Sequence, residues 1–240
     1  MNNQNNHQHI VGAEVVQHRT KIRSFVRREG RFTQSQKQAL DENWDAFGIE
    51  YDEQKIDFPL LFERDAYTVL EIGFGNGKSL AKMAATYPEI NYLGIEVHRP
   101  GVGQLLKQLR DEEINNVRIM THDAKEVLIN KIPDASLDAL YLFFPDPWPK
   151  RKHHKRRLVQ ADFVQLIAAK LKVGGVFHVA TDWQDYARYV LKVMAVAESF
   201  QNRAGTDLYV PCPEYRSLTK FERRGQKLGY QIRDMVFERI

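Results

Sequence analysis

The chain has 240 residues, 43% of them hydrophobic and 28% charged, which is the composition of an ordinary folded protein with one domain of α/β size. With Cys212 as its one cysteine, the chain can form neither an internal disulfide nor a cysteine-based zinc site. It also contains no run of about 18 apolar residues, the length that a membrane-spanning helix needs. The net charge of +4 is too small to indicate a polyanionic partner by itself, so the distribution of the charge matters more. We expect a cytoplasmic protein with neither a metal nor a membrane partner. The sequence leaves the oligomeric state open, with a monomer as the default.

The amino-terminal part of the chain differs in composition from the rest. Residues 1–18 are rich in Asn, Gln and His, which predicts a disordered polar arm, and they lack the basic and apolar stretches of a secretory signal. Residues 19–59 form a basic extension that contains a helix. Residues 60–240 contain no linker that would divide them, so we expect a single main domain there.

Strands and helices alternate from residue 67 onward. Apolar runs of strand length are each followed by a stretch with helical spacing, which predicts a parallel sheet with helices on both faces. The expected strands cover residues 68–72, 92–97, 117–120, 137–144, 176–181 and 231–240. The expected helices cover about 33–47, 79–86, 101–112, 124–130, 158–171, 184–199 and 221–228.

A turn with the sequence Gly-Phe-Gly-Asn-Gly, residues 73–77, follows the first expected strand. It is not a phosphate loop, because Ile72 stands where the first glycine is needed, and it departs from the dinucleotide-binding turn, because Lys78 replaces the third glycine. An acid, Glu71, followed by Gly-x-Gly-x-Gly is the pattern of S-adenosylmethionine-dependent methyltransferases. Such glycines let a ligand lie against the backbone at the sheet edge where open α/β folds bind ligands.

Four acidic residues occupy the same place in four successive strand–helix units. Each lies at or just past the carboxyl end of its expected strand: Glu71, Glu96, Asp123 and Asp146. A carboxylate after the second strand can accept hydrogen bonds from both ribose hydroxyls of the cofactor, and one after the third can accept from the adenine amino group. A single such acid is usually a helix cap or a solvated loop end. Four in register with the glycine turn favour a cofactor site.

A rigid acidic segment and a basic run follow the fourth expected strand. The prolines of Pro-Asp-Pro-Trp-Pro, residues 145–149, fix an extended segment that holds Asp146 beside Trp148. The alternative is a proline-rich turn with Trp148 in the core. Six of the next eight residues, 150–157, are Lys or Arg, and two are His. Such runs are usually solvated faces, but this position favours an anionic polymer that passes the site.

These motifs resemble the bacterial tRNA (guanine-N7-)-methyltransferase family, from about residue 19 to the end of the chain. The matching segments are Ile22–Arg28, Leu70–Gly75, Gly94–His98, Pro145–Lys150 with His154–Arg157, Ala180–Trp183 and Thr219–Arg223. The resemblance implies a Rossmann-like methyltransferase fold with a mostly parallel seven-stranded sheet and helices on both faces. It also implies S-adenosylmethionine as cofactor, tRNA as partner, and N7 of guanine 46 in the variable loop as the methylated atom.

The resemblance further implies roles for individual residues. Contacts to the cofactor would come from Glu71, Gly73, Gly75, Gly77, Glu96, Asp123 and Asp146, and Asp146 would also be catalytic. Contacts to the substrate guanine would come from Lys150, Asp182, Thr219, Lys220, Phe221 and Glu222. Contacts to RNA would come from Lys152, His153, His154, Lys155, Arg156 and Arg157. Pro149 stands where some members carry His, so that side chain receives no catalytic role.

Two other functions fit parts of the pattern. A nicotinamide-dependent oxidoreductase would bind NAD instead of S-adenosylmethionine, and an RNA-binding module on a methyltransferase-like scaffold would bind tRNA without methyl transfer. For the methyltransferase, guanine N7 has an in-plane lone pair and no proton to lose, so alignment of the reactants would do most of the work. Whether Asp146 acts as a base or only positions the guanine stays open.

Overall fold

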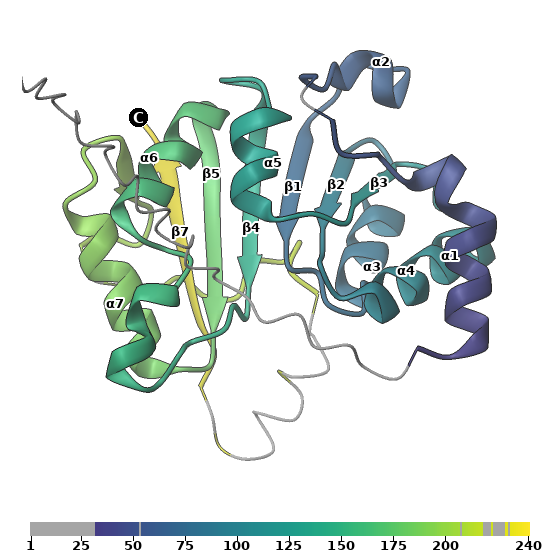
Figure 1. Ribbon diagram of the computed structural model, residues 1–240. Helices are drawn as coiled ribbons and strands as arrows, with labels where there is room; N and C mark the ends of the chain where they lie inside the picture. Colours follow the sequence, from purple (N-terminus) through teal and green to yellow (C-terminus); the bar gives the residue numbers. More distant parts are fainter. Residues whose placement is uncertain (1–31, 53, 207, 218–221, 223–228, 230) are drawn as a thin grey trace, which may run out of the picture.

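The computed structural model describes residues 32–52, 54–206, 208–217, 222, 229 and 231–240 (Figure 1). The predictions for residues 1–31, for the helix at 221–228, and for Thr219, Lys220 and Phe221 lie outside these residues, apart from Glu222. A seven-stranded sheet in the order β3-β2-β1-β4-β5-β7-β6 forms the centre of the molecule. Strands β1 to β5 are parallel, and β7 runs antiparallel between β5 and β6. The predicted fold class is confirmed.

The elements have the following bounds. The strands are β1 (Thr68–Ile72), β2 (Asn91–Ile95), β3 (Val117–Met120), β4 (Leu137–Phe143), β5 (Leu171–Thr181), β6 (Phe200–Asn202) and β7 (Arg233–Arg239). The α-helices are α1 (Gln34–Phe47), α2 (Phe58–Phe62), α3 (Lys78–Thr86), α4 (Arg99–Asp111), α5 (Ala124–Asn130), α6 (Ala161–Lys170) and α7 (Gln184–Ala195), and η1 (Arg151–Arg156) is a 3-10 helix.

Helices cover both faces of the sheet because successive strand residues point to opposite sides. Leu70 and Ile72 of β1 belong to the core under α5, α6 and α7, whereas Val69 belongs to the core under α1, α3 and α4. Over β5 and β7 on this second face lies the segment 208–217, whose Val210 pairs with Asp234 of β7. The parallel strands therefore end together along one edge of a buried sheet.

Helix α1 is attached to the rest of the domain through α4. Thr33 and Gln36 form a reciprocal capping box that begins α1. The α4 residue Gly103 lies so close to α1 that an added Cβ would be 2.3 Å from the carbonyl oxygen of Gln36. The helix predicted at 33–47 is confirmed. Among the described residues, no helix is long and apolar enough to cross a membrane.

Four elements differ from the sequence prediction, one of them the 3-10 helix η1, where no helix was expected. Strand β5 begins at Leu171, not near residue 176, because Leu171 pairs with Leu137 before a register shift. Gly174 and Gly175, which precede the expected strand, lie inside this longer strand. Helix α2 and strand β6 were not predicted, since five and three residues are too few to show a periodicity.

Candidate active site

The residues predicted to bind the cofactor lie at the edge where the parallel strands end. Strands β1 and β4 are neighbours although they are not consecutive in the chain, so the strand order reverses between them. Ligands of open α/β sheets bind outside such a switch point, at the carboxyl ends of the strands. The glycine turn follows β1 there, and the predicted acids follow their own strands: Glu96 after β2, Asp123 after β3, Asp146 after β4 and Asp182 after β5.

The three glycines of the turn all have left-handed backbone angles, with φ of 78° at Gly73, 62° at Gly75 and 73° at Gly77. An added Cβ at Gly73 or Gly75 would meet no atom within 4 Å. At Gly77 it would lie 2.5 Å from the Cβ of Leu105 in α4. Gly77 therefore serves helix packing, while Gly73 and Gly75 leave an open face of backbone on which a ligand can lie.

Glu71 is the most deeply buried acid of the site. Its side chain is 3% exposed, and its Oε2 atom has no hydrogen-bond partner among the described residues. Burial and, secondarily, repulsion from Glu96 raise the pKa of Glu71 to about 8. A cation or a hydrogen-bond donor bound in the glycine turn would supply what this carboxyl group lacks.

Glu96 joins the end of β2 to the glycine turn. Its Oε2 accepts a hydrogen bond from the backbone N–H of Gly75 at 2.8 Å. Its Oε1 accepts from Val97 at 2.7 Å and from His98 at 2.9 Å. The carboxylate is thus held by three backbone donors at the mouth of the site.

Asp123 is the N-cap of α5. Its Oδ1 accepts from the backbone N–H groups of Lys125 at 2.9 Å and Glu126 at 3.4 Å. The capping function that is usual for a loop-end acid is therefore present. It uses one carboxylate oxygen, so Oδ2 remains available for a contact to a ligand.

The segment that carries Asp146 is strained at both ends. Phe144 and Trp148 have φ of 51° and 44°, a left-handed conformation that bulky residues rarely adopt. The N–H of Phe144 donates to the carbonyl of Ala180 at 2.8 Å, and the carbonyl of Pro147 accepts from Arg157 Nε at 2.9 Å. Asp146 is exposed between these two anchors. The surroundings hold the segment in a fixed shape, and Trp148 is half-buried there, not in the core.

The basic run divides into an exposed part and one buried residue. No residue of η1 is buried, and the guanidinium of Arg156 lies 4.9 Å from the centre of the Trp148 ring. Arg157 is 2% exposed: it donates to Pro147, lies 2.5 Å from Asp185 in α7, and packs over the ring of Tyr189. We therefore reassign Arg157 from phosphate contact to positioning the Asp146 segment.

The described residues that are predicted to hold the guanine differ in their burial and in their partners. Asp182 is half-buried directly after β5, and Lys150 is exposed at the start of η1. Glu222 is 2% exposed, and its carboxylate accepts from both terminal nitrogens of Arg216, at 2.7 and 2.8 Å. In this conformation Glu222 is engaged with an arginine and does not face an open site.

A buried polar network around Arg216 escaped the sequence prediction. Arg216 also donates to Asp234 of β7 at 3.0 Å, and Asp234 contacts His178 Nε2 at 2.8 Å. The hydroxyl of Tyr215 lies 2.9 Å from His178 Nδ1. The Arg216 guanidinium is 5.9 Å from the ring centres of Phe143 and Phe144, so the network lies behind the strained segment. No local pattern indicates it, because its members come from distant parts of the chain.

Comparison with known proteins agrees with this arrangement. A sequence profile described as "Putative methyltransferase" matches residues 65–235. A tRNA (guanine-N(7)-)-methyltransferase of Pectobacterium atrosepticum is 58% identical over 92% of each chain, and one of Hydrogenovibrio crunogenus is 52% identical over 96% of each chain. The chain belongs to the tRNA (guanine-N(7)-)-methyltransferase family.

Solved structures share the fold of this tRNA (guanine-N(7)-)-methyltransferase family member at low sequence identity. A 16S rRNA methyltransferase, KamB, has a TM-score of 0.58 at 16% identity and covers 81% of this chain and 99% of its own. A SAM-dependent O-methyltransferase from Thermotoga maritima has a TM-score of 0.50 at 16% identity, covering 78% and 67%.

S-adenosylmethionine is the methyl donor expected from the sequence, and the Thermotoga maritima structure is of a SAM-dependent methyltransferase. The residues at the site fit that molecule. Its ammonium and sulfonium groups are positive, and Glu71 has a buried oxygen without a partner. The open backbone at Gly73 and Gly75 leaves room for a ligand, and Glu96 and Asp123 add carboxylate acceptors for the ribose and adenine.

Proposed function

We propose that this protein methylates N7 of a guanine in tRNA, and that the guanine is the one at position 46 in the variable loop. The observation that carries the proposal is the place of Asp146. It sits in a strained, anchored segment between the acids that fit the cofactor and the exposed cations of η1. The relatives at 52% and 58% identity support the same substrate class.

Alignment is the main task of the protein in this reaction. S-adenosylmethionine supplies a methyl group on a positively charged sulfur, and guanine N7 attacks it with an in-plane lone pair without losing a proton. Asp146 and Asp182 follow the neighbouring strands β4 and β5, where they can accept hydrogen bonds from N1–H and the amino group of guanine. Acceptors on that edge make the ring more electron-rich as N7 becomes positive, and the fixed segment keeps the base in line with the methyl group.

The target base must leave its stack before it can reach the site. Contacts to the RNA backbone from Lys152, Lys155 and Arg156 on η1 would hold the tRNA while the base is turned outward. These cations lie within ten residues of Asp146 along the chain, and Arg156 packs on Trp148 beside it.

The proposal is tested with unmodified tRNA and S-adenosylmethionine that carries a labelled methyl group. We expect label in tRNA, mapped to N7 of guanine 46, and none in a transcript with adenine at that position. Label at another guanine would contradict the proposed position 46 but would still support methylation of guanine N7 in tRNA. Binding of tRNA without any transfer would favour an RNA-binding module instead.

A further inference from the structure

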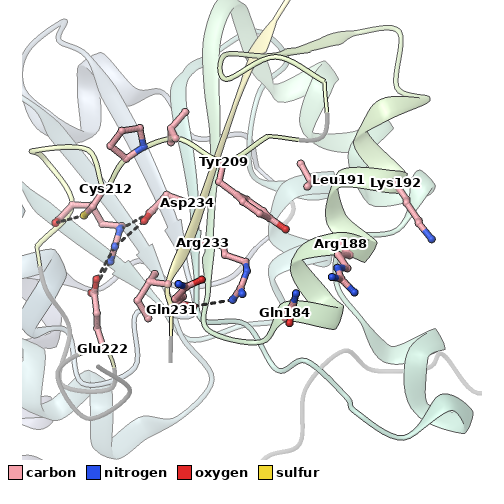
Figure 2. A pocket seen from close by; sticks show the side chains of 14 residues that line it. Gln184, Arg188, Leu191, Lys192, Tyr209, Cys212, Glu222, Gln231, Arg233 and Asp234 are labelled. Atoms are coloured by element: carbon pink, nitrogen blue, oxygen red, sulfur yellow. Dashed lines mark hydrogen bonds and ion pairs between the residues drawn. The ribbon is translucent and has the colours of Figure 1, made fainter. Parts of the chain in front are cut away.

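A groove of about 930 Å³ opens along α7 (Figure 2). Its first wall is one side of α7, with Gln184, Arg188, Leu191 and Lys192. Its second wall comes from residues 209–212 and 231–234. The α7 residues that contact Arg157, namely Asp185 and Tyr189, do not line the groove and lie on the adjoining strip of the same helix. We call this feature the α7 groove.

The exposed charges of the α7 groove are positive. Arg188 and Lys192 are exposed on α7, and Arg233 is half-buried on the facing wall (Figure 2). Among the described residues that line the groove, the acids are Glu222 and Asp234, which are both buried and ion-paired with Arg216. Asp185, outside the lining, is ion-paired with Arg157 and lies near Arg188, so it offsets part of this charge. The groove lining itself still presents a net positive surface, which attracts an anionic ligand.

The lining also contains groups that recognise nucleotides. Tyr209 is 36% exposed, and the Arg233 guanidinium lies 5.9 Å from its ring centre. An exposed tyrosine ring flanked by arginine is a platform for an unstacked base, and stacking of this kind tolerates any base. Gln184 and Gln231 add amide groups that can donate to and accept from ribose hydroxyls.

The position of the α7 groove connects it to the site of the reaction. Gln184, the first residue of α7, follows Asp182 by two positions, so one end of the groove lies beside the carboxyl end of β5. A target base that has left its stack brings the neighbouring nucleotides of its strand to the protein surface. The groove is a charged depression next to that end of the site.

We propose that the α7 groove binds the tRNA strand that continues from the methylated guanine, with phosphates on Arg188, Lys192 and Arg233 and a base on Tyr209. This inference rests on the proposed function. It assigns the RNA a second contact surface, whose lining shares no residue with η1.

The phosphate part is tested with a triple variant, Arg188→Gln, Lys192→Gln and Arg233→Gln. We expect tRNA affinity to fall by about tenfold or more at 0.1 M salt, and the slope of log affinity against log salt to decrease by about 2. The KM for tRNA should rise far more than kcat falls, and S-adenosylmethionine affinity should hold. The matched control replaces three cations at the opposite end of the sheet by Gln: Lys82 of α3 and Lys107 and Arg110 of α4. Its affinity and slope should match those of the parent.

The stacking part is tested at Tyr209. Tyr209→Phe keeps the ring and should bind tRNA like the parent, whereas Tyr209→Leu should lose on the order of fivefold to a hundredfold in affinity without a change in salt slope. Both are exposed substitutions that leave the core intact, so they remain informative if the triple variant unfolds. Equal tRNA affinity of Tyr209→Leu and the parent would overturn the base contact.

Two outcomes would overturn the phosphate contacts alone. The first is an unchanged salt slope in the triple variant. The second is an equal decrease of tRNA affinity and slope in the control variant, which would show that only the net charge of the protein matters. Both leave the parent able to methylate tRNA. A parent protein that neither binds nor methylates tRNA would instead contradict the proposed function, and the groove assignment with it.

Discussion

The carboxyl group of Glu71 makes stability depend on pH. The pKa of Glu71 is about 8 in the folded protein against 4.5 for an ordinary glutamate. Between these values the folded state holds a proton that the unfolded state has lost. The free energy of unfolding should therefore fall by about 1.4 kcal/mol for each pH unit across this window. The Glu71→Gln variant has no carboxyl group at this position, so its free energy of unfolding should lack this pH dependence.

Urea unfolding of the parent and of Glu71→Gln from pH 4 to 9 measures the effect. The stability of the parent relative to the variant should decrease steadily from about pH 5 to 8 and level off outside that range. A constant difference would show that the Glu71 carboxyl titrates normally. Added S-adenosylmethionine should favour the ionised form, so its affinity for the parent should rise toward pH 8.

Asp146 should be needed for methyl transfer and not for folding. The side chain is exposed, and the segment is held through backbone contacts of Phe144 and Pro147. We expect Asp146→Asn and Asp146→Ala to lower kcat at least tenfold, the size of a lost hydrogen bond to a charged group, with an unchanged midpoint of thermal unfolding. Methylation by both variants at the parental rate would remove Asp146 from the site.

Sequence reasoning located acidic and basic residues but not their burial. Arg157 sits in a run of cations, and its neighbours in the chain give no sign that Asp185 and Tyr189 enclose it. Glu222 belongs to a segment of mixed charge, yet its carboxylate faces Arg216 inside the protein. Such pairings depend on tertiary contacts, which no periodicity encodes.

At the scale of elements, two glycines of α4 contact different parts of the molecule. A Cβ at Gly101 would lie 1.9 Å from the carbonyl oxygen of Gly75 in the glycine turn, whereas one at Gly103 would press on Gln36 of α1. We expect Gly101→Ala to displace the turn and weaken S-adenosylmethionine binding by tenfold or more. Gly103→Ala should disturb α1 and lower stability, with cofactor affinity near that of the parent.

Calorimetric titration with the cofactor and thermal unfolding of both variants separate the two effects. Alanine is the better helix former by about 1 kcal/mol, so any loss of stability comes from the contacts and not from helix propensity. Equal cofactor affinity in the two variants would show that the turn adapts to the added methyl group.

The alternation of strands and helices could be predicted from the sequence, because each parallel strand is a continuous apolar run and the helix after it has apolar residues at helical spacing. The place of β7 was not readable in the same way. Its apolar pattern predicts a strand, but its position between β5 and β6 is set by pairings such as Phe177 with Phe237 and Asn202 with Phe237. Contacts over such distances in the chain leave no trace in a local window.

At the scale of the whole molecule, the exposed cations of η1 should control the salt dependence of tRNA binding. Replacement of Lys152, Lys155 and Arg156 by Gln should lower tRNA affinity and decrease the salt slope by about 2, with cofactor affinity retained. Arg157→Gln should act differently, because it leaves Asp185 and the Pro147 carbonyl without their partner. We expect that variant to lose stability by about 1–3 kcal/mol.

Filter binding at several salt concentrations, together with thermal unfolding, distinguishes the two cases. An unchanged slope in the triple variant would make η1 an ordinary solvated surface. A stable Arg157→Gln variant with a flattened slope would return Arg157 to the RNA-contacting set.

The reversal of strand order at β1 and β4 has a consequence for the history of such proteins. The stretch up to α5 carries the glycine turn and three of the acids that fit the donor, Glu71, Glu96 and Asp123. The stretch from β4 onward carries the residues predicted to hold the acceptor, and Asp146 within it is predicted to contact both. Binding of the methyl donor and binding of the acceptor thus depend mainly on consecutive segments of the chain. Mutations after β4 can accumulate and retarget the enzyme while the donor half stays under selection. That division would allow the acceptor to change while the donor site is kept.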